Sequence, residues 1–332
     1  MSCEMSAILC GVGGFVPSSL VTNADLAERF DTTDEWIRSR TGIRQRHVVA
    51  NGESTSDLAV RAGVAAMKSA GVDSVDLVVL ATATPDRPCP ATAPAVASAL
   101  GLSQVAAFDL SAVCTGFVYG LATVAGFIES GIAERILLIG ADTFSTILDP
   151  ADRSTTAVFG DGAGAVVVRR GNIGEPGALL AFDLGSDGDL ADLITVRAGG
   201  SKHPLPVGQV ATADHRFSMQ GRAVYRQATR WMTASANAVL ARVGWQPGDL
   251  DWFVGHQANQ RILEAVGRDL GIAPEHVLVN VDRVGNTVAA SIPLALADAS
   301  AEGALRPGDK VVLTAFGGGI TWGSVALTWP DL

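Results

Sequence analysis

The chain has 332 residues, of which 48% are hydrophobic and 17% charged, so it is neither an intrinsically disordered nor a fibrous protein. Its net charge of −10 argues against a nucleic-acid-binding surface. No apolar run reaches the roughly 18 residues of a membrane span, and the first residues lack the features of a signal peptide. Four irregularly spaced cysteines are typical of reduced thiols in a cytoplasmic protein.

Short runs of Val, Ile and Leu alternate with longer helical stretches, which predicts an α/β fold with largely parallel sheets. The strands predicted for the first half are Ala7–Val12, Leu77–Ala83, Ala106–Leu110, Ile136–Gly140 and Ala163–Arg169. Those predicted for the second half are Ala178–Leu184, Asp251–Gly255, His276–Val281, Lys310–Ala315 and Ser324–Trp329.

The two halves have the same rhythm, and two strands share one spacing. The strand that begins after Asp76 lies 175 positions before the one that begins after Asp251, and Ile136 lies 175 positions before Val311. Each half also ends in a glycine-rich turn and a final strand. Any two α/β halves resemble each other to some degree, but a shared offset favours a duplication. We therefore predict two halves, residues 1–172 and 173–332.

Cys114 stands between a predicted strand and an apolar helix that begins at Gly116. Free backbone N–H groups and the helix dipole at such a position favour the thiolate. The alternative is an ordinary core cysteine, which is the commoner fate of a single cysteine. Local sequence alone leaves both interpretations open.

His256 ends a predicted strand, so its imidazole should emerge at the carboxyl edge of the sheet, where open α/β folds bind ligands. Asn286 is predicted to follow a strand and to precede the helix 289–300. By itself it would be read as a turn or N-cap residue. The duplication, however, gives Asn286 a position matching that of Cys114, and we expect Cys114, His256 and Asn286 to meet in one cleft.

Eight segments together resemble the ketoacyl-acyl-carrier-protein synthase III family, and the resemblance spans essentially the whole chain. They are TDEWI (33–37), RTGIR (40–44), DLSAVCTGF (109–117), DPADR (149–153), FGDGAG (159–164), GHQAN (255–259), GNT (285–287) and AFGGGITWG (315–323). The resemblance implies a thiolase-type fold in which two duplicated halves form five α-β-α-β-α layers, assembled as a homodimer. It also implies that Cys114, His256 and Asn286 catalyse decarboxylative condensation of an acyl-CoA primer with malonyl-acyl carrier protein, without a metal or a permanently bound cofactor.

The resemblance extends to residues around this catalytic set. Gly318 is expected to stabilise an oxyanion through its N–H, Phe316 to lie near the decarboxylation site, and Cys89 to line the partner's acyl pocket. The expected coenzyme A contacts are Trp36, Arg40, Thr41, Arg153, Gly221 and Asn259. The expected carrier-protein contacts are Arg226, Arg261 and Arg268.

Three positions depart from the family pattern. Val113 and Thr115 replace small alanines, and Arg222 replaces an asparagine near the coenzyme tunnel, so the pocket width and some cofactor contacts are open. The chief alternative function is transfer of the acyl group from Cys114 to a hydroxyl or amine acceptor. A catalytically silent partner subunit is a second alternative, which retention of all three polar residues disfavours.

Overall fold

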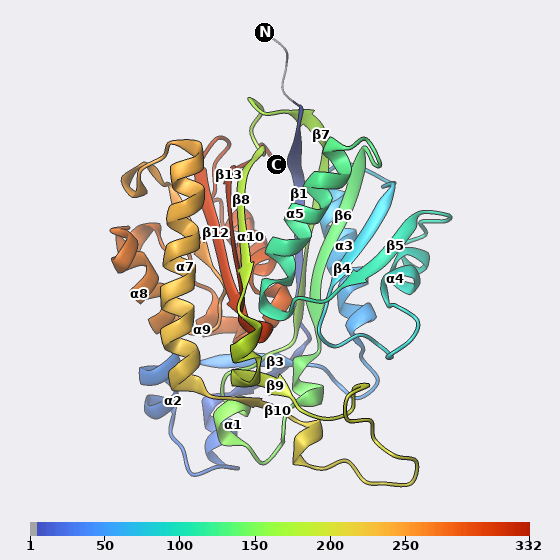
Figure 1. Cartoon of the computed structure of the whole chain (residues 1–332), viewed down its shortest axis with the longest axis vertical. Helices are drawn as coiled ribbons and strands as arrows, with labels where there is room; N and C mark the ends of the chain where they lie inside the picture. The colour runs from blue at the N-terminus through green and yellow to red at the C-terminus, as the bar shows by residue number, and fades with distance from the viewer. Residues whose placement is uncertain (1–4) are drawn as a thin grey trace.

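The computed structural model describes residues 5–332, which form two large β-sheets with helices between and outside them, and two small two-stranded sheets (Figure 1). The first part of the chain contains β1 (Met5–Phe15), β2 (Ser19–Thr22), α1 (Asn23–Ala27), α2 (Asp34–Thr41), β3 (Gln45–Val48), α3 (Thr55–Ser69), β4 (Leu77–Ala81), α4 (Ala93–Ala99), β5 (Ala106–Leu110), α5 (Gly116–Glu129), β6 (Arg135–Asp142), α6 (Arg153–Thr156) and β7 (Gly162–Asn172). The remainder contains β8 (Leu179–Ser186), β9 (Ile194–Val196), β10 (Phe217–Met219), α7 (Gly221–Val243), β11 (Trp252–Gly255), α8 (Gln260–Leu270), α9 (Val281–Val284), α10 (Ser291–Ala301), β12 (Lys310–Gly317) and β13 (Thr321–Thr328).

The two large sheets have matching topology. The first has the order β1-β7-β6-β4-β5 and the second β8-β13-β12-β11. Each sheet contains a matching parallel pair (β4 with β6, β11 with β12), and the strands beyond β6 and β12 are antiparallel. A single parallel bridge between Phe253 and Val277 occupies the place that β5 has in the first sheet.

Alternation along the strands divides the core into layers, since successive side chains of a strand point to opposite faces. Val78 and Leu80 of β4 pack outward with α3 and α4, whereas Leu77 and Val79 pack inward with α5 and α10. The second sheet repeats this division, with α7 and α8 on its outer face. Figure 1 shows the resulting five layers from left to right, which confirms the predicted thiolase-type fold.

The middle layer explains the composition of its helices. α5 is apolar on nearly all sides because it lies between two sheets, and a helix buried in this way needs no polar face. Its Gly120 permits close approach to β6, since a Cβ atom there would lie 2.6 Å from Leu138 Cδ1. Within residues 5–332, no helix is both long enough and apolar enough to cross a membrane.

The predicted strand His276–Val281 is wrong. Residues Pro274–His276 form a 3₁₀ turn, and α9 begins at Val281. The buried side chain of Gln257 provides the reason: its Nε2 donates to the Leu278 carbonyl, and its Oε1 accepts from the N–H of Asn280. A side-chain amide thus replaces the neighbouring strand beyond the single bridge at Val277.

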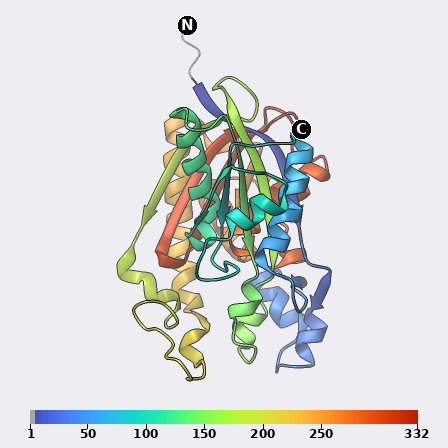
Figure 2. The same cartoon turned by 90° about the vertical axis from the view of Figure 1, so that its right-hand side faces the viewer.

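Segments outside the five layers gather at one end of the molecule. In both views, the region of α1 and α2 and the hairpin β9–β10 lie below the sheets (Figure 2). The cavity described next lies at the carboxyl ends of the parallel strands, since several of its lining residues follow β5, β6 and β11 or end β12. The division of the chain at residues 172 and 173 stays a prediction.

Candidate active site

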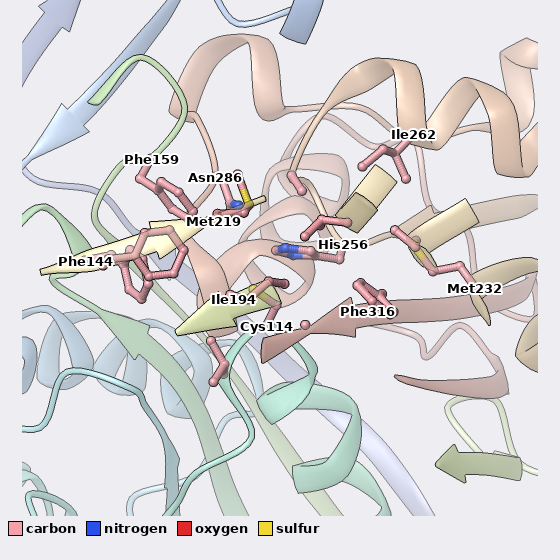
Figure 3. A pocket seen from close by; sticks show the side chains of 16 residues that line it. Cys114, Phe144, Phe159, Ile194, Met219, Met232, His256, Ile262, Asn286 and Phe316 are labelled. Atoms are coloured by element: carbon pink, nitrogen blue, oxygen red, sulfur yellow. The ribbon is translucent and has the colours of Figure 1, made fainter. Parts of the chain in front are cut away.

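A narrow cavity of about 40 Å³ brings Cys114, His256 and Asn286 together (Figure 3). The rest of its lining is almost entirely apolar and consists of Val113, Phe144, Phe159, Ile194, Phe217, Met219, Val224, Ala228, Met232, Ala258, Ile262, Phe316 and Gly317. Three hydrogen-bonding side chains in an apolar enclosure are typical of a site that binds an apolar group and acts on its polar end.

Cys114 lies in a 3₁₀ turn, Val113–Thr115, directly before α5. The turn is strained, since Val113 has a φ of 48°. The Thr115 hydroxyl fixes it by donating to the Ala112 carbonyl at 2.7 Å and by a 2.7 Å hydrogen bond with the Thr321 hydroxyl. The predicted position at a helix start is therefore observed.

The ionisation of Cys114 differs from the expectation. Burial raises the pKa of the thiol well above its usual range, and the negative charge of Asp142 raises it further. The cysteine's own backbone N–H opposes the rise but does not outweigh it. In this cavity the resting residue is a thiol, because burial dominates over the helix terminus.

His256 directly follows β11 and is 3% exposed. Its Nδ1 forms a 2.6 Å hydrogen bond with the Ser291 hydroxyl, which also accepts from the Gln257 N–H at 3.3 Å. Burial lowers the pKa of the imidazole to about 3, so the ring is neutral at physiological pH. Since Nδ1 is bonded to Ser291, Nε2 is the nitrogen left for a ligand.

Asn286 follows α9 and not a strand, which corrects the expected local structure. Its backbone forms a parallel bridge with Phe159, in which its N–H donates to the Val158 carbonyl and its carbonyl accepts from the Gly160 N–H. Its side-chain Oδ1 accepts from the Val288 N–H at 2.9 Å. With its oxygen held in this way, the amide NH₂ is the free hydrogen-bonding group.

The glycine turn after β12 contacts the Cys114 turn directly. A Cβ atom on Gly317 would lie 2.9 Å from Cys114 Cβ and 3.0 Å from Cys114 N. A Cβ atom on Gly318 would lie 3.3 Å from Val113 Cγ2. Phe316 lines the cavity, so the segment predicted to surround the reacting group does lie beside it.

The predicted coenzyme A residues lie outside this cavity. The guanidinium carbons of Arg40 and Arg153 each lie 4.6 Å from the centroid of the Trp36 ring. A planar base could stack on Trp36 only after one arginine moved away. The Asn259 amide donates to the Arg40 carbonyl at 3.0 Å, which joins α2 to the start of α8.

Thr41 does not have the geometry expected of a phosphate contact. It is 7% exposed, its hydroxyl donates to the Ile37 carbonyl at 2.7 Å, and it accepts from the Ile43 N–H at 3.1 Å. Its side chain therefore stabilises the end of α2. Gly221, by contrast, is exposed at the first position of α7.

The predicted carrier-protein residues are all exposed on two neighbouring helices, Arg226 on α7 and Arg261 and Arg268 on α8. Arg222 and Arg230 extend the basic row along α7 at intervals of four residues, which places them on one face. Cys89 is exposed and does not line the cavity of its own chain.

Two residues of the site had no predicted role. Ser291, the first residue of α10, holds His256, and Gln257 holds the segment that leads to Asn286. The only available signal for Ser291 is its distance of 175 positions from Gly116, which begins α5.

Comparison with known proteins identifies the class. Residues 108–188 match the family described as 3-oxoacyl-acyl-carrier-protein synthase III, and residues 240–329 match its C-terminal family. A beta-ketoacyl-acyl-carrier-protein synthase III of Streptomyces coelicolor is 58% identical over 327 residues, which cover 98% of each chain.

Solved structures agree with this class. The crystal structure of 3-oxoacyl-acyl-carrier-protein synthase III from Pseudomonas aeruginosa is 54% identical and superposes with a TM-score of 0.92, covering 98% of this chain and 99% of the other. The priming β-ketosynthase of the R1128 polyketide pathway is 34% identical with a TM-score of 0.90, covering 98% and 97%. The chain belongs to the 3-oxoacyl-acyl-carrier-protein synthase III family.

Proposed function

We propose that this protein condenses an acyl-CoA primer with malonyl-acyl carrier protein, with loss of carbon dioxide, to give a 3-ketoacyl product. The observation that carries the proposal is the convergence of one cysteine, one neutral histidine and one asparagine amide in a single apolar cavity. A thiol can hold an acyl group covalently, and two neutral donors can stabilise an enolate without protonating it.

In the first half-reaction, Cys114 Sγ attacks the thioester carbonyl of acyl-CoA. A new C–S bond forms, the bond to the coenzyme sulfur breaks, and the thiol proton passes to the departing sulfur. The N–H groups of Cys114 and Gly318 stabilise the tetrahedral oxyanion, and such a donor is typically worth about 3–4 kcal/mol of barrier. The close packing of the glycine turn on Cys114 supports this assignment.

In the second half-reaction, malonyl-acyl carrier protein replaces coenzyme A. His256 Nε2 and the Asn286 amide donate to its thioester carbonyl, the bond to the carboxylate breaks, and carbon dioxide leaves. The enolate carbon then attacks the acyl carbonyl, the bond between that carbon and Cys114 Sγ breaks, and the released thiolate takes a proton from solvent to return to the resting thiol. Donation from Nε2 requires the proton on that nitrogen, which is favoured when the Ser291 hydroxyl donates to Nδ1.

Residues outside the cavity bind the coenzyme A and the carrier protein that bring the two acyl groups. Arg153 moves off the Trp36 ring, and the adenine ring then binds between the two side chains. Arg40, Gly221 and Asn259 contact the phosphates and the pantetheine arm. Arg226, Arg261 and Arg268 bind the acidic carrier protein. Their exposure, on a chain of net charge −10, supports this role.

The protein assembles as a homodimer in the cytoplasm. Within the described residues, β5 pairs with β4 alone, so its other edge offers unpaired backbone groups for a second copy. Cys89 then lies on the loop that closes the partner's acyl pocket. The three described cysteines are unpaired, which supports a reducing compartment.

The test separates the two half-reactions. We expect Cys114→Ala to lose acylation by acyl-CoA completely in intact-mass spectra. His256→Ala and Asn286→Ala should still acylate but should release about 100-fold less carbon dioxide from malonyl-acyl carrier protein. A panel of acyl-CoA primers in the same assay identifies the preferred acyl group.

Two outcomes contradict the proposal. Covalent acylation of Cys114→Ala would show that Cys114 is not the nucleophile. Transfer of the acyl group to a hydroxyl or amine acceptor, with no condensation on malonyl-acyl carrier protein, would identify the related acyltransferase activity instead.

A further inference from the structure

The offset of 175 residues extends from the strands into the catalytic turns. β4 and β6 pair Leu77 with Ile136, and β11 and β12 pair Trp252 with Val311, so both registers differ by the same offset. The turn Val113–Thr115 before α5 corresponds in the same way to Val288–Ala290 before α10. Both turns begin with a valine of positive φ, 48° and 54°. The counterpart of Cys114 is therefore Ala289 and not Asn286, which corrects the expected match: at this offset Asn286 corresponds to Ser111.

Each turn is contacted by the last residue of a central strand from the other half, and these residues differ. Gly317 ends β12 and leaves the backbone of Cys114 uncovered, since any Cβ atom would come within 3.0 Å of its N. Asp142 ends β6, and its Oδ2 accepts from the Ala289 N–H at 3.0 Å. The Asp142 carboxylate therefore binds the backbone of the Val288–Ala290 turn. The matching position on the Val113–Thr115 turn has no side chain from Gly317 and is open to an oxyanion.

The other oxygen of Asp142 is fully engaged within its own half. Oδ1 accepts from the Ala83 N–H at 2.7 Å, the Thr84 N–H at 3.1 Å, and the hydroxyls of Thr82 and Thr84. The side chain is fully buried and joins the end of β4 to the turn of the opposite half.

The amino ends of the same strands do not show this difference. There, Asp76 Oδ2 accepts from the Arg135 N–H, and its counterpart Asp251 accepts from the Lys310 N–H, both at 2.8 Å. A carboxylate is present in both halves at that end. The asymmetry between Asp142 and Gly317 is therefore confined to the catalytic end of the sheets.

The turn held by Asp142 connects both residues assigned to decarboxylation. Asn286 Oδ1 accepts from the Val288 N–H at 2.9 Å, and the Ser291 hydroxyl that follows the turn binds His256 Nδ1 at 2.6 Å. Displacement of the Ala289 N–H would shift both attachments. The turn of Cys114 has a tether of its own, since the Thr115 hydroxyl donates to the Ala112 carbonyl.

We propose that Asp142 is a positioning residue for decarboxylation: by binding the Ala289 N–H it fixes the turn that orients Asn286 and, through Ser291, His256. This inference rests on the proposed function, because it assigns the two half-reactions to separate turns. Fixing donors to within a fraction of an ångström is worth a large factor in rate, and a 1 Å misplacement can cost about 100-fold.

The charge of Asp142 makes the proposal distinguishable from a general loss of structure. Asp142 is the charged group that raises the pKa of the Cys114 thiol. Asp142→Asn removes that charge and also places an amide NH₂ against N–H and hydroxyl donors. The same substitution should therefore ease ionisation of Cys114 while it disturbs the Val288–Ala290 turn.

The experiment measures three quantities on the full-length protein carrying Asp142→Asn, with Asp76→Asn as the matched control. We expect carbon dioxide release from malonyl-acyl carrier protein to fall about 10- to 100-fold. Acylation by acyl-CoA should not fall, and because ionisation of Cys114 is eased it should rise together with the rate at which iodoacetamide alkylates Cys114 at a given pH. Asp76→Asn, which loses a backbone contact at the opposite end of the same strands, should leave all three unchanged.

A double variant tests the route through Asn286. If Asp142 acts through the turn, the loss in Asp142→Asn combined with Asn286→Ala should be smaller than the product of the two single losses, because the part exerted through Asn286 is already gone and only the part exerted through Ser291 and His256 remains. Equal losses in both half-reactions, or unchanged decarboxylation, would overturn the proposal.

A second variant is used if Asp142→Asn does not fold. Thr82→Val removes one donor to the Asp142 carboxylate and should lower decarboxylation selectively. An equal loss of acylation in Thr82→Val would likewise overturn the proposal. Absence of carbon dioxide release by the wild type would instead contradict the proposed function.

Discussion

His256 and Cys114 share an apolar enclosure that favours the neutral form of each side chain. For Cys114 burial raises the pKa of the thiol and so opposes loss of its proton before the thioester arrives. For His256 it means a neutral ring that donates a hydrogen bond without protonating the enolate. Burial therefore disfavours the Cys114 thiolate in the first half-reaction and keeps the His256 ring neutral for the second.

The buried histidine should also make stability depend on pH. Its pKa in the folded protein is about 3, below the value of about 6.5 in an unfolded chain. Between these values the unfolded state binds more protons, so the free energy of unfolding rises with pH, by at most about 1.4 kcal/mol per unit. His256→Gln should flatten this dependence in denaturation curves between pH 4.5 and 7. His203→Gln, on an exposed loop, should not, and an unchanged slope in His256→Gln would contradict the assignment.

Gly317 offers a second test at the scale of one atom. Gly317→Ala places a Cβ atom 3.0 Å from Cys114 N, and the contact atom is backbone, so the turn must move. We expect acylation to fall by about 100-fold, as for a comparable misplacement of a reacting group. Gly126→Ala in α5 meets nothing within 4 Å and should leave acylation unchanged, as a stopped-flow release of coenzyme A would show.

The positions of Cys114 and His256 could be predicted because each follows an apolar strand. Asp142, Ser291 and Gln257 could not, because they act through contacts between segments far apart in the chain. A carboxylate at the end of strand β6, whose interior is apolar, is a weak signal by itself. The comparison of Asp142 with Gly317, which lies 175 positions later, is what indicates a role for this carboxylate.

At the scale of elements, the hairpin β9–β10 forms one wall of the cavity through Ile194, Phe217 and Met219. Phe217 packs edge-on against Phe144 and Phe159, with ring centroids 4.9 and 5.0 Å apart. These three rings limit the space available to an acyl chain. Strands as short as β9 and β10, with three residues each, carry too little pattern to be predicted from sequence.

Phe217→Leu should open this wall. The smaller side chain leaves space beside Phe144, so longer acyl-CoA primers should acylate Cys114 better relative to short ones, by about 10-fold or more per accommodated group. Competition between two acyl-CoA species, read by intact mass, measures the shift. Phe127→Leu, which changes the Phe108–Phe127 pair outside the cavity, is the control, and an equal shift there would contradict this view of the wall.

At the scale of the whole molecule, an acidic protein must attract an acidic partner. Arginines are exposed on α7 and α8, and we propose them as the carrier-protein contact on a chain whose net charge would otherwise disfavour an acidic partner. Added salt should therefore weaken the second half-reaction more than the first.

Arg226→Glu combined with Arg261→Glu tests this surface. We expect the KM for malonyl-acyl carrier protein to rise about 10-fold or more while the rate of acylation by acyl-CoA is unchanged. Arg306→Glu lies just before β12, at the opposite end of that strand from the active site, and should change neither value. Equal effects of both substitutions would exclude the α7–α8 surface as the docking site.

The shared middle layer also determines how the chain can come apart. Phe117 and Leu121 of α5 and Ile292 and Leu296 of α10 belong to one continuous core that includes the inner faces of both sheets. Neither half can cover its inner face without the other, so unfolding should be a single cooperative transition. Fragments 1–172 and 173–332 should aggregate when produced separately and regain activity only when produced together.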